Sequence, residues 1–136
     1  MLRRLRILHV VAVLLLPWLV ACNPQPALPQ VSLEQARADH EAGRVVLIDI
    51  REPKEHATGV AAGARLLPMS QLGQRLGEIP QSSEKPVYLI CNTQNRSRAV
   101  LSALLEQGYK HVHFVQGGMS EWAVRGWPMV PPAANP

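Results

Sequence analysis

The sequence predicts an α/β fold in which helices cover both faces of a parallel β-sheet. Two continuous apolar runs, residues 45–48 (VVLI) and 87–90 (VYLI), are typical of strands that are buried on both faces. Segments with helical periodicity lie between these runs, and strands that are joined through helices run parallel. The chain has 136 residues, which is enough for one domain with a hydrophobic core and too few for two.

Most of the predicted elements have a local signal. Ser32 and Gln35 have the spacing of a capping box, which begins a helix that ends at Gly43. Pro53 suits the first turn of a short helix. The longest helix ends at Gly108 and carries its apolar residues on one face. After the first helix and the strand at 45–48, the order is a helix (53–57), a weak strand (64–67), a helix (70–76), a strand (87–90), a helix (96–107), a strand (112–115) and a helix (120–124).

Composition and charge exclude several classes of protein. Hydrophobic residues make up 47% of the chain and charged residues 18%, so an intrinsically disordered chain is excluded. The formal net charge is +4, but three basic residues lie among the first six, and the charge without residues 1–21 is +1. We therefore expect no nucleic-acid partner. The two cysteines, Cys22 and Cys91, have no metal-ligand spacing, so we expect no metal and no cofactor.

Residues 1–21 are predicted to form a secretory signal peptide. Three arginines precede an apolar run that is shorter than a membrane-spanning helix requires. The run ends in LVAC at Cys22, which resembles the lipobox of bacterial lipoproteins. That resemblance implies a diacylglyceryl group on Cys22 that attaches the mature protein to the membrane. A retained anchor helix and cleavage after Ala21 without lipid are the alternatives.

The same resemblance implies a location, and the proline-rich segments at both ends of the mature chain indicate its domain boundaries. A lipid-anchored protein of this kind lies in the bacterial cell envelope and faces the periplasm. Asn23 is not the aspartate that retains lipoproteins on the inner membrane, so the outer membrane is favoured. Lipidated Cys22 and a Pro-rich tether occupy residues 22–30, the folded domain residues 31–130, and a tail residues 131–136.

Cys91 is the candidate reactive residue. It follows a predicted buried strand, and four polar residues separate it from Arg96 and the longest helix. In open α/β sheets, ligands bind beyond the carboxyl ends of the strands. The positive end of the helix dipole and the charges of Arg96 and Arg98 favour a thiolate there, which is the reactive form of cysteine. The alternative is a small cysteine buried at the end of a core strand.

Four segments of the chain together resemble the single-domain rhodanese, or sulfurtransferase, family. They are residues 49–56 (DIREPKEH), 59–64 (GVAAGA), 91–97 (CNTQNRS) and 116–128, the last with QGGM, Trp122, Gly126 and Pro128. The resemblance implies a three-layer α/β/α sandwich around a five-stranded parallel sheet. It also implies sulfur transfer through a persulfide on Cys91.

The resemblance assigns roles to the residues around Cys91. A small sulfane-sulfur donor, thiosulfate or a persulfide, gives its outer sulfur to Cys91, and a thiol or cyanide accepts it. Loop amides would solvate the negative charge on that sulfur. The substrate-binding residues are Asn92, Thr93, Gln94, Asn95, Arg96 and Ser97, and Asp49 and Arg51 support them. We expect Arg96 to brace the loop, Ser97 to act as a helix cap, Asp49 to bond loop amides or an arginine, and Arg51 to pair with Glu52.

The loop departs from the family pattern C-x-x-G-x-R-S. Gln94 replaces the glycine, which predicts either a strained left-handed residue or a different path with the Gln94 amide in the mouth of the loop. Asn92 stands where bacterial members often have arginine, so we expect Cys91 to accept sulfur but thiosulfate:cyanide transfer to be slow. The alternative function is a non-catalytic or redox-sensing binding module. Rhodanese-fold phosphatases have five residues, not four, between cysteine and arginine, which argues against phosphatase activity.

Overall fold

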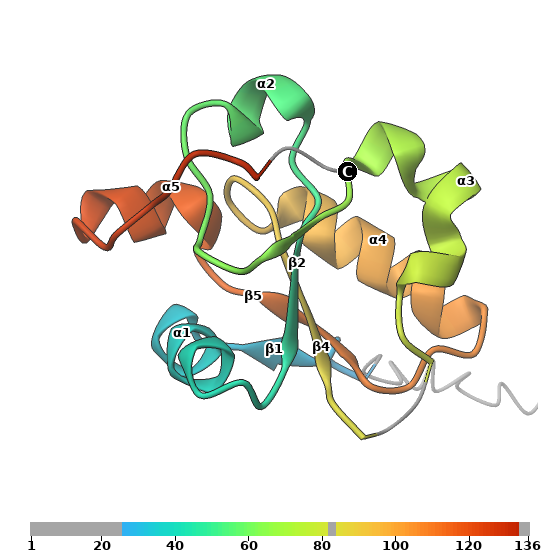
Figure 1. Cartoon of the computed structure of the whole chain (residues 1–136). Helices are drawn as coiled ribbons and strands as arrows, with labels where there is room; N and C mark the ends of the chain where they lie inside the picture. The colour runs from blue at the N-terminus through green and yellow to red at the C-terminus, as the bar shows by residue number, and fades with distance from the viewer. Residues whose placement is uncertain (1–25, 82–83, 134–136) are drawn as a thin grey trace, which may run out of the picture.

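The computed structural model describes residues 26–81 and 84–133, so the predicted signal peptide and Cys22 lie outside the described residues. Five strands form one parallel sheet in the order β1-β5-β4-β2-β3 (Figure 1). The elements are β1 (Gln30–Val31), α1 (Leu33–Glu41), β2 (Val46–Asp49), α2 (Pro53–His56), β3 (Arg65–Leu66), α3 (Leu72–Arg75), β4 (Val87–Ile90), α4 (Asn95–Glu106), β5 (Val112–Val115) and α5 (Gly118–Val124). The expected five-stranded parallel sheet is confirmed.

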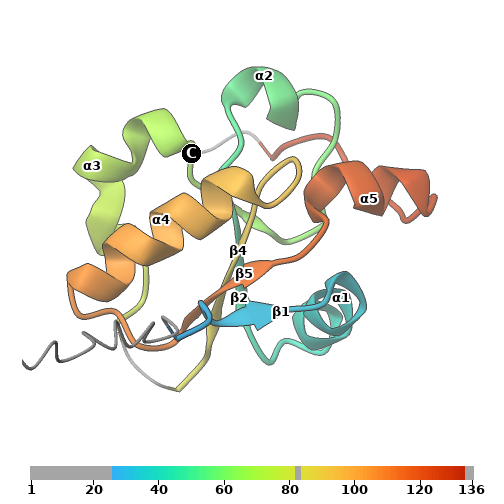
Figure 2. The ribbon, with the colours of Figure 1, turned by 180° about the vertical axis from the view of Figure 1, so that it is seen from behind.

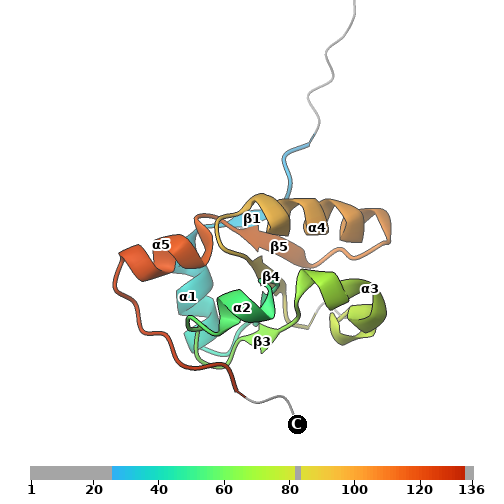
Figure 3. The same cartoon turned by 90° about the horizontal axis from the view of Figure 1, so that it is seen from above.

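The sheet is the middle layer of three. Helices α1 and α5 lie on one side of it, and α3 and α4 lie on the other (Figure 3). Along β4, Val87 and Leu89 pack with α3 and α4, whereas Tyr88 and Ile90 pack with α1 and α5. This alternation follows from the pleat of the strand, and it explains why a strand buried on both faces is apolar throughout. The same alternation directs the side chain of Cys91 to the α4 side.

The fifth strand, β1, has no counterpart among the strands predicted from local sequence. Gln30 and Val31 pair with Phe114 and Val115 of β5, so the sheet begins at a residue assigned to the tether. Only two residues are involved, and neither the length nor the pattern of this segment signals a strand. Pairing with β5 makes it one, because β5 offers a free edge of backbone donors and acceptors.

The predicted helix over residues 70–76 is also different in the structure. It is divided into a 3-10 turn (Met69–Gln71), the short α3, and a second 3-10 turn (Leu76–Glu78). Gly73 and Gly77 lie within this segment, and glycine in a helix interior costs about 1 kcal/mol relative to alanine. The strands predicted at 87–90 and 112–115 have the same bounds in the structure, and the other helices and strands differ from their predicted bounds by at most two residues.

Helix α2 positions the remaining part of the candidate site. It lies beyond the carboxyl end of β2, and the loop from β4 to α4 passes between α2 and the beginning of α5 (Figure 2). Across the two described ranges of the chain, no helix combines the length and the apolar character that crossing a membrane requires.

Candidate active site

Cys91 is placed at the carboxyl end of the central strand. It directly follows β4, which lies between β5 and β2, and the loop that it begins reaches α4 at Asn95. The carboxyl edge of a parallel sheet is the usual position of a binding site, because the loops and helix N-termini converge there. The location alone makes this loop the candidate active site.

The sulfur of Cys91 lies beneath the first turn of α4. The backbone amide of Ser97 donates to Sγ at 3.4 Å, and the thiol donates to Ser97 Oγ at 3.4 Å. The Ser97 hydroxyl in turn donates to the carbonyl of Gln94 at 3.1 Å. Only 1% of Cys91 is exposed. The thiol therefore faces the positive end of the α4 dipole and is covered from solvent in this conformation.

Ser97 does not cap α4, and the sequence-based expectation for it is wrong. The helix begins at Asn95, and Gln94 occupies the N-cap position. Ser97 therefore lies within the first turn, where it is fully buried and binds the thiol. The N-cap lies only three residues before Ser97, but the difference changes what Ser97 does. A residue in the first turn directs its backbone amide toward the loop, where the Ser97 amide binds the sulfur of Cys91.

The carbonyl groups at the start of the loop face α5. Met119 N donates to Cys91 O and Ser120 N donates to Asn92 O, each at 2.8 Å. In a planar trans peptide the N–H points opposite to the C=O, so the amides of residues 92 and 93 point away from α5 and into the loop. Gly118 permits this approach: it has a φ of +63°, and a Cβ there would lie 2.1 Å from Thr93 O.

At Gln94 the loop takes a different path and the residue is not strained, which is the second of the two alternatives predicted from the sequence. Its side chain binds the backbone of Gly117. Its φ is −156°, so it is not in the left-handed region. Gln94 Oε1 accepts a hydrogen bond from Gly117 N at 3.2 Å. The side chain thus joins the loop to the beginning of α5. The three other polar loop residues, Asn92, Thr93 and Asn95, are exposed at the rim.

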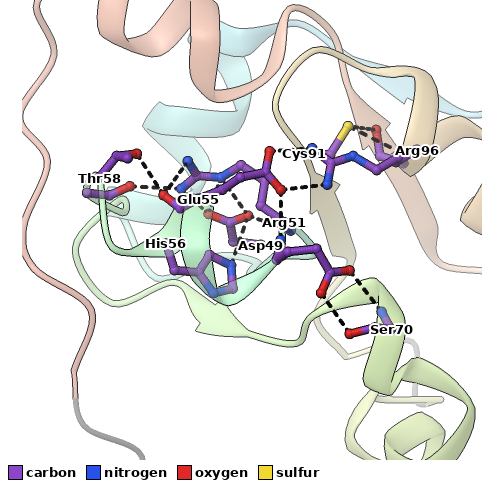
Figure 4. Close-up of polar contacts among 11 residues, drawn as sticks. Asp49, Arg51, Glu55, His56, Thr58, Ser70, Cys91 and Arg96 are labelled. Atoms are coloured by element: carbon purple, nitrogen blue, oxygen red, sulfur yellow. Dashed lines mark hydrogen bonds and ion pairs between the residues drawn. The ribbon is translucent and has the colours of Figure 1, made fainter.

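Arg96 forms an ion pair with Glu55 of α2. Its two terminal nitrogens donate to the two Glu55 oxygens at 2.6 and 2.7 Å. Hydrogen bonding from Arg96 is the largest cause that lowers the pKa of Glu55 to about 2, and the same contact raises the pKa of Arg96. Glu55 Oε2 also accepts from Glu52 N at 2.9 Å, which completes the capping box of α2. The pair therefore braces the active loop against α2, as Figure 4 shows.

Asp49 and Arg51 support α2 rather than the loop. Arg51 donates to Asp49 Oδ2 at 2.6 Å through one terminal nitrogen and to both carboxylate oxygens at 3.0 Å through Nε. Asp49 is completely buried and Arg51 is 3% exposed. The remaining Arg51 donors reach the carbonyls of Glu55 and Gly59. The expected Arg51–Glu52 pair is wrong, since Glu52 instead accepts from the amide and hydroxyl of Ser70.

Glu55 and His56 are the site residues that the sequence analysis left without a role. Glu55 belongs to the family segment at residues 49–56, so the sequence offered a signal for it. Its pairing with Arg96 could not be predicted, because 41 residues separate the two along the chain. His56 is 4% exposed, and its Nε2 lies 3.4 Å from Asp49 Oδ1 without hydrogen-bond geometry. Over residues 26–81 and 84–133, no three potential metal ligands come together.

Comparison with known proteins identifies the family. Residues 32–125 match the Rhodanese-like domain. A protein named sulfurtransferase from Allochromatium vinosum is 40% identical over 101 residues, which cover 74% of this chain and 91% of that protein. A rhodanese-related protein from Thermoplasma volcanium has a TM-score of 0.66 at 25% identity, over 76% of this chain and 99% of that one. CoADR-RHD from Bacillus anthracis has a TM-score of 0.67 at 32% identity, over 76% of this chain but 18% of that one. The family match extends from α1 to α5, and together with the 40% identical relative it shows that this chain belongs to the rhodanese-like domain family.

Proposed function

We propose that this chain is a sulfurtransferase that carries sulfane sulfur as a persulfide on Cys91. The observation that carries the proposal is the hydrogen bond from Ser97 N to Cys91 Sγ, at the N-terminus of α4. It indicates that the loop is built to hold negative charge on sulfur. Family membership and the sulfurtransferase name of the relative at 40% identity support the same type of function.

The chemistry consists of two displacements at sulfur. In the first, the Cys91 thiolate attacks the outer sulfur of the donor. A new S–S bond forms to Cys91, the S–S bond within the donor breaks, and sulfite or a thiolate leaves with the bonding electron pair. In the second, an acceptor thiolate or cyanide attacks the outer sulfur of the Cys91 persulfide, a bond forms between the acceptor and that sulfur, and the S–S bond to Cys91 breaks with its electron pair returning to Cys91. No group is needed as an acid, because sulfite and thiolates leave as anions.

The burial of Cys91 adds a condition to this mechanism. Sγ is directed toward Ser97, and the residue is 1% exposed. A donor reaches the sulfur only after the side chain rotates toward the inward amides of residues 92 and 93, or after the loop moves. Exchange between rotamers requires no change in the backbone. The two amides then take the place of the Ser97 amide as donors to the outer sulfur.

Mass spectrometry tests the proposal directly. The purified protein is incubated with thiosulfate or with an organic persulfide, and the modification of Cys91 is determined. We expect the addition of one sulfur atom to Cys91, its absence in Cys91→Ala, and its discharge by cyanide as thiocyanate. Sulfenic acid or mixed disulfides without any sulfur transfer would overturn the proposal in favour of the redox-sensing alternative.

We propose further that the mature protein is a lipid-anchored protein of the bacterial cell envelope that faces the periplasm. The sequence LVAC at Cys22, directly after a basic and apolar segment, supports this location. Two acyl chains hold a protein stably in a membrane, whereas one does not. We expect Cys22→Ser to abolish labelling by a fatty-acid probe and to release the protein from membranes. Unchanged membrane retention of this variant would contradict the anchor.

A further inference from the structure

The charge of Arg96 is cancelled at the mouth of the Cys91 loop. We propose that Glu55, by pairing with Arg96, makes this site selective for persulfide donors of low charge over the thiosulfate dianion. This inference rests on the proposed function, and it assigns Glu55 the role of a specificity-determining residue. It depends on three features: the geometry of the pair, the other charges near it, and the charge of the two donors.

The geometry of the pair occupies the guanidinium of Arg96. Both terminal nitrogens bind the Glu55 carboxylate, at 2.6 and 2.7 Å. Glu55 is itself held by the Glu52 amide at 2.9 Å, and Arg51 binds the Glu55 carbonyl at 3.3 Å (Figure 4). A bidentate pair between such fixed partners is the strong form of this interaction. Arg96 therefore cannot turn toward an anion in the loop without losing two short hydrogen bonds.

The surrounding charges do not replace the one that is cancelled. Glu52 acts on Arg96 as a second nearby negative charge. Asp49 and Arg51 neutralise each other in the interior. The rim residues Asn92, Thr93 and Asn95 and the half-buried Gln94 are neutral.

Arg98 at the start of α4 and Lys54 on α2 are oriented elsewhere or screened. The guanidinium of Arg98 lies over the ring of Phe114, 5.6 Å from its centroid. Lys54 is exposed on α2, where water and salt screen its charge. The mouth of the loop consequently presents hydrogen-bond donors with little positive charge behind them.

This arrangement discriminates between donors by their charge. Thiosulfate carries two negative charges and releases sulfite, which carries two as well. An organic persulfide carries at most one negative charge and releases a thiolate. The inward amides can solvate a single anionic sulfur, but a dianion requires a positive charge close to it. A neutral mouth therefore favours the persulfide in both the attack and the departure of the leaving group.

The experiment compares the two donors in wild type and in Glu55→Gln. The kcat/KM for sulfur transfer is measured with thiosulfate and with 2-hydroxyethyl persulfide, at low salt. We expect the ratio of the two values to shift toward thiosulfate by at least about tenfold, equivalent to about 1.4 kcal/mol. Glu41→Gln is the matched control, because it removes one carboxylate from an exposed pair with Arg37 on α1. Its ratio should stay within about twofold of wild type.

A second measurement uses the wild-type protein alone, so it decides the question if Glu55→Gln does not fold. Salt weakens the attraction between a dianion and a positive site. We expect wild-type kcat/KM for thiosulfate to be constant or to rise with ionic strength. A steep fall with salt would show an uncancelled positive charge at the mouth and would overturn the inference. An unchanged donor ratio in folded Glu55→Gln would overturn it too, whereas failure of Cys91 to accept sulfur from either donor would instead refute the proposed function.

Discussion

The contact between Gly118 and the active loop is open to a stringent test by the substitution Gly118→Ala. A Cβ at this position would lie 2.1 Å from Thr93 O, 2.5 Å from Cys91 O and 2.6 Å from Asn92 O. All three atoms belong to the backbone, so no side-chain rotation can relieve the overlap. The loop and α5 must move apart. That separation breaks the hydrogen bonds that hold the loop carbonyls to the beginning of α5.

The expected loss of stability follows from two contributions. A residue other than glycine in the left-handed region costs about 1–2 kcal/mol. Each of the two broken hydrogen bonds contributes about 1 kcal/mol. The sum is about 3–4 kcal/mol, which is a large part of the 5–15 kcal/mol that is typical of a folded domain. Gly126 provides a matched control, because its φ of +66° is nearly the same and a Cβ there would meet no atom within 4 Å.

Two measurements distinguish the effect of the overlap between a Cβ at position 118 and the loop from the cost of a left-handed backbone, which both variants share. Urea unfolding, followed by the fluorescence of the buried Trp122, should show Gly118→Ala losing about 2 kcal/mol more than Gly126→Ala. Alkylation of Cys91 by iodoacetamide should be faster in Gly118→Ala only, since the displaced loop exposes the thiol. If the two variants unfold at the same urea concentration and react at the same rate, α5 does not hold the loop.

Three further predictions follow from the polar contacts. Asp49→Asn leaves the buried guanidinium of Arg51 without its counter-charge, and urea unfolding should show a loss of about 3 kcal/mol or more. The lowered pKa of Glu55, about 2 in the folded protein, means that its pair with Arg96 stabilises the fold above about pH 4.5 and that this stability is lost as the pH falls toward 2. Acid titration of the unfolding free energy should reveal this loss, about 1 kcal/mol for a partly exposed pair, and it should be absent from Glu55→Gln. Tyr88→Phe removes a 2.9 Å hydrogen bond to a buried carboxylate on α1 and should cost about 1 kcal/mol, measured by thermal unfolding.

The helices and strands that could be predicted from the sequence are those whose residue pattern lies within the element itself. The strand β4 is apolar because both of its faces are buried, and α4 has a continuous apolar side. Both patterns can be recognised within a short window of sequence. The strand β1 is different, because it exists only through pairing with β5, more than 80 residues away. The Glu55–Arg96 pair, the Asp49–Arg51 pair and the short helical turns around α3 depend likewise on tertiary contacts that no window of sequence contains.

The position of Gln94 shows how such a contact changes the meaning of a residue. From the sequence alone, a glutamine in place of a family glycine predicts either a strained left-handed residue or a different path with the Gln94 amide in the mouth of the loop. In the structure the residue is unstrained, and its side chain accepts a hydrogen bond from Gly117 N. The loop thereby gains a third attachment to the beginning of α5, beside those from Met119 and Ser120. Because two of the three attachments use backbone carbonyls, the loop keeps two of them whichever residue stands at position 94, and a glycine there is not required to hold the amides of residues 92 and 93 inward.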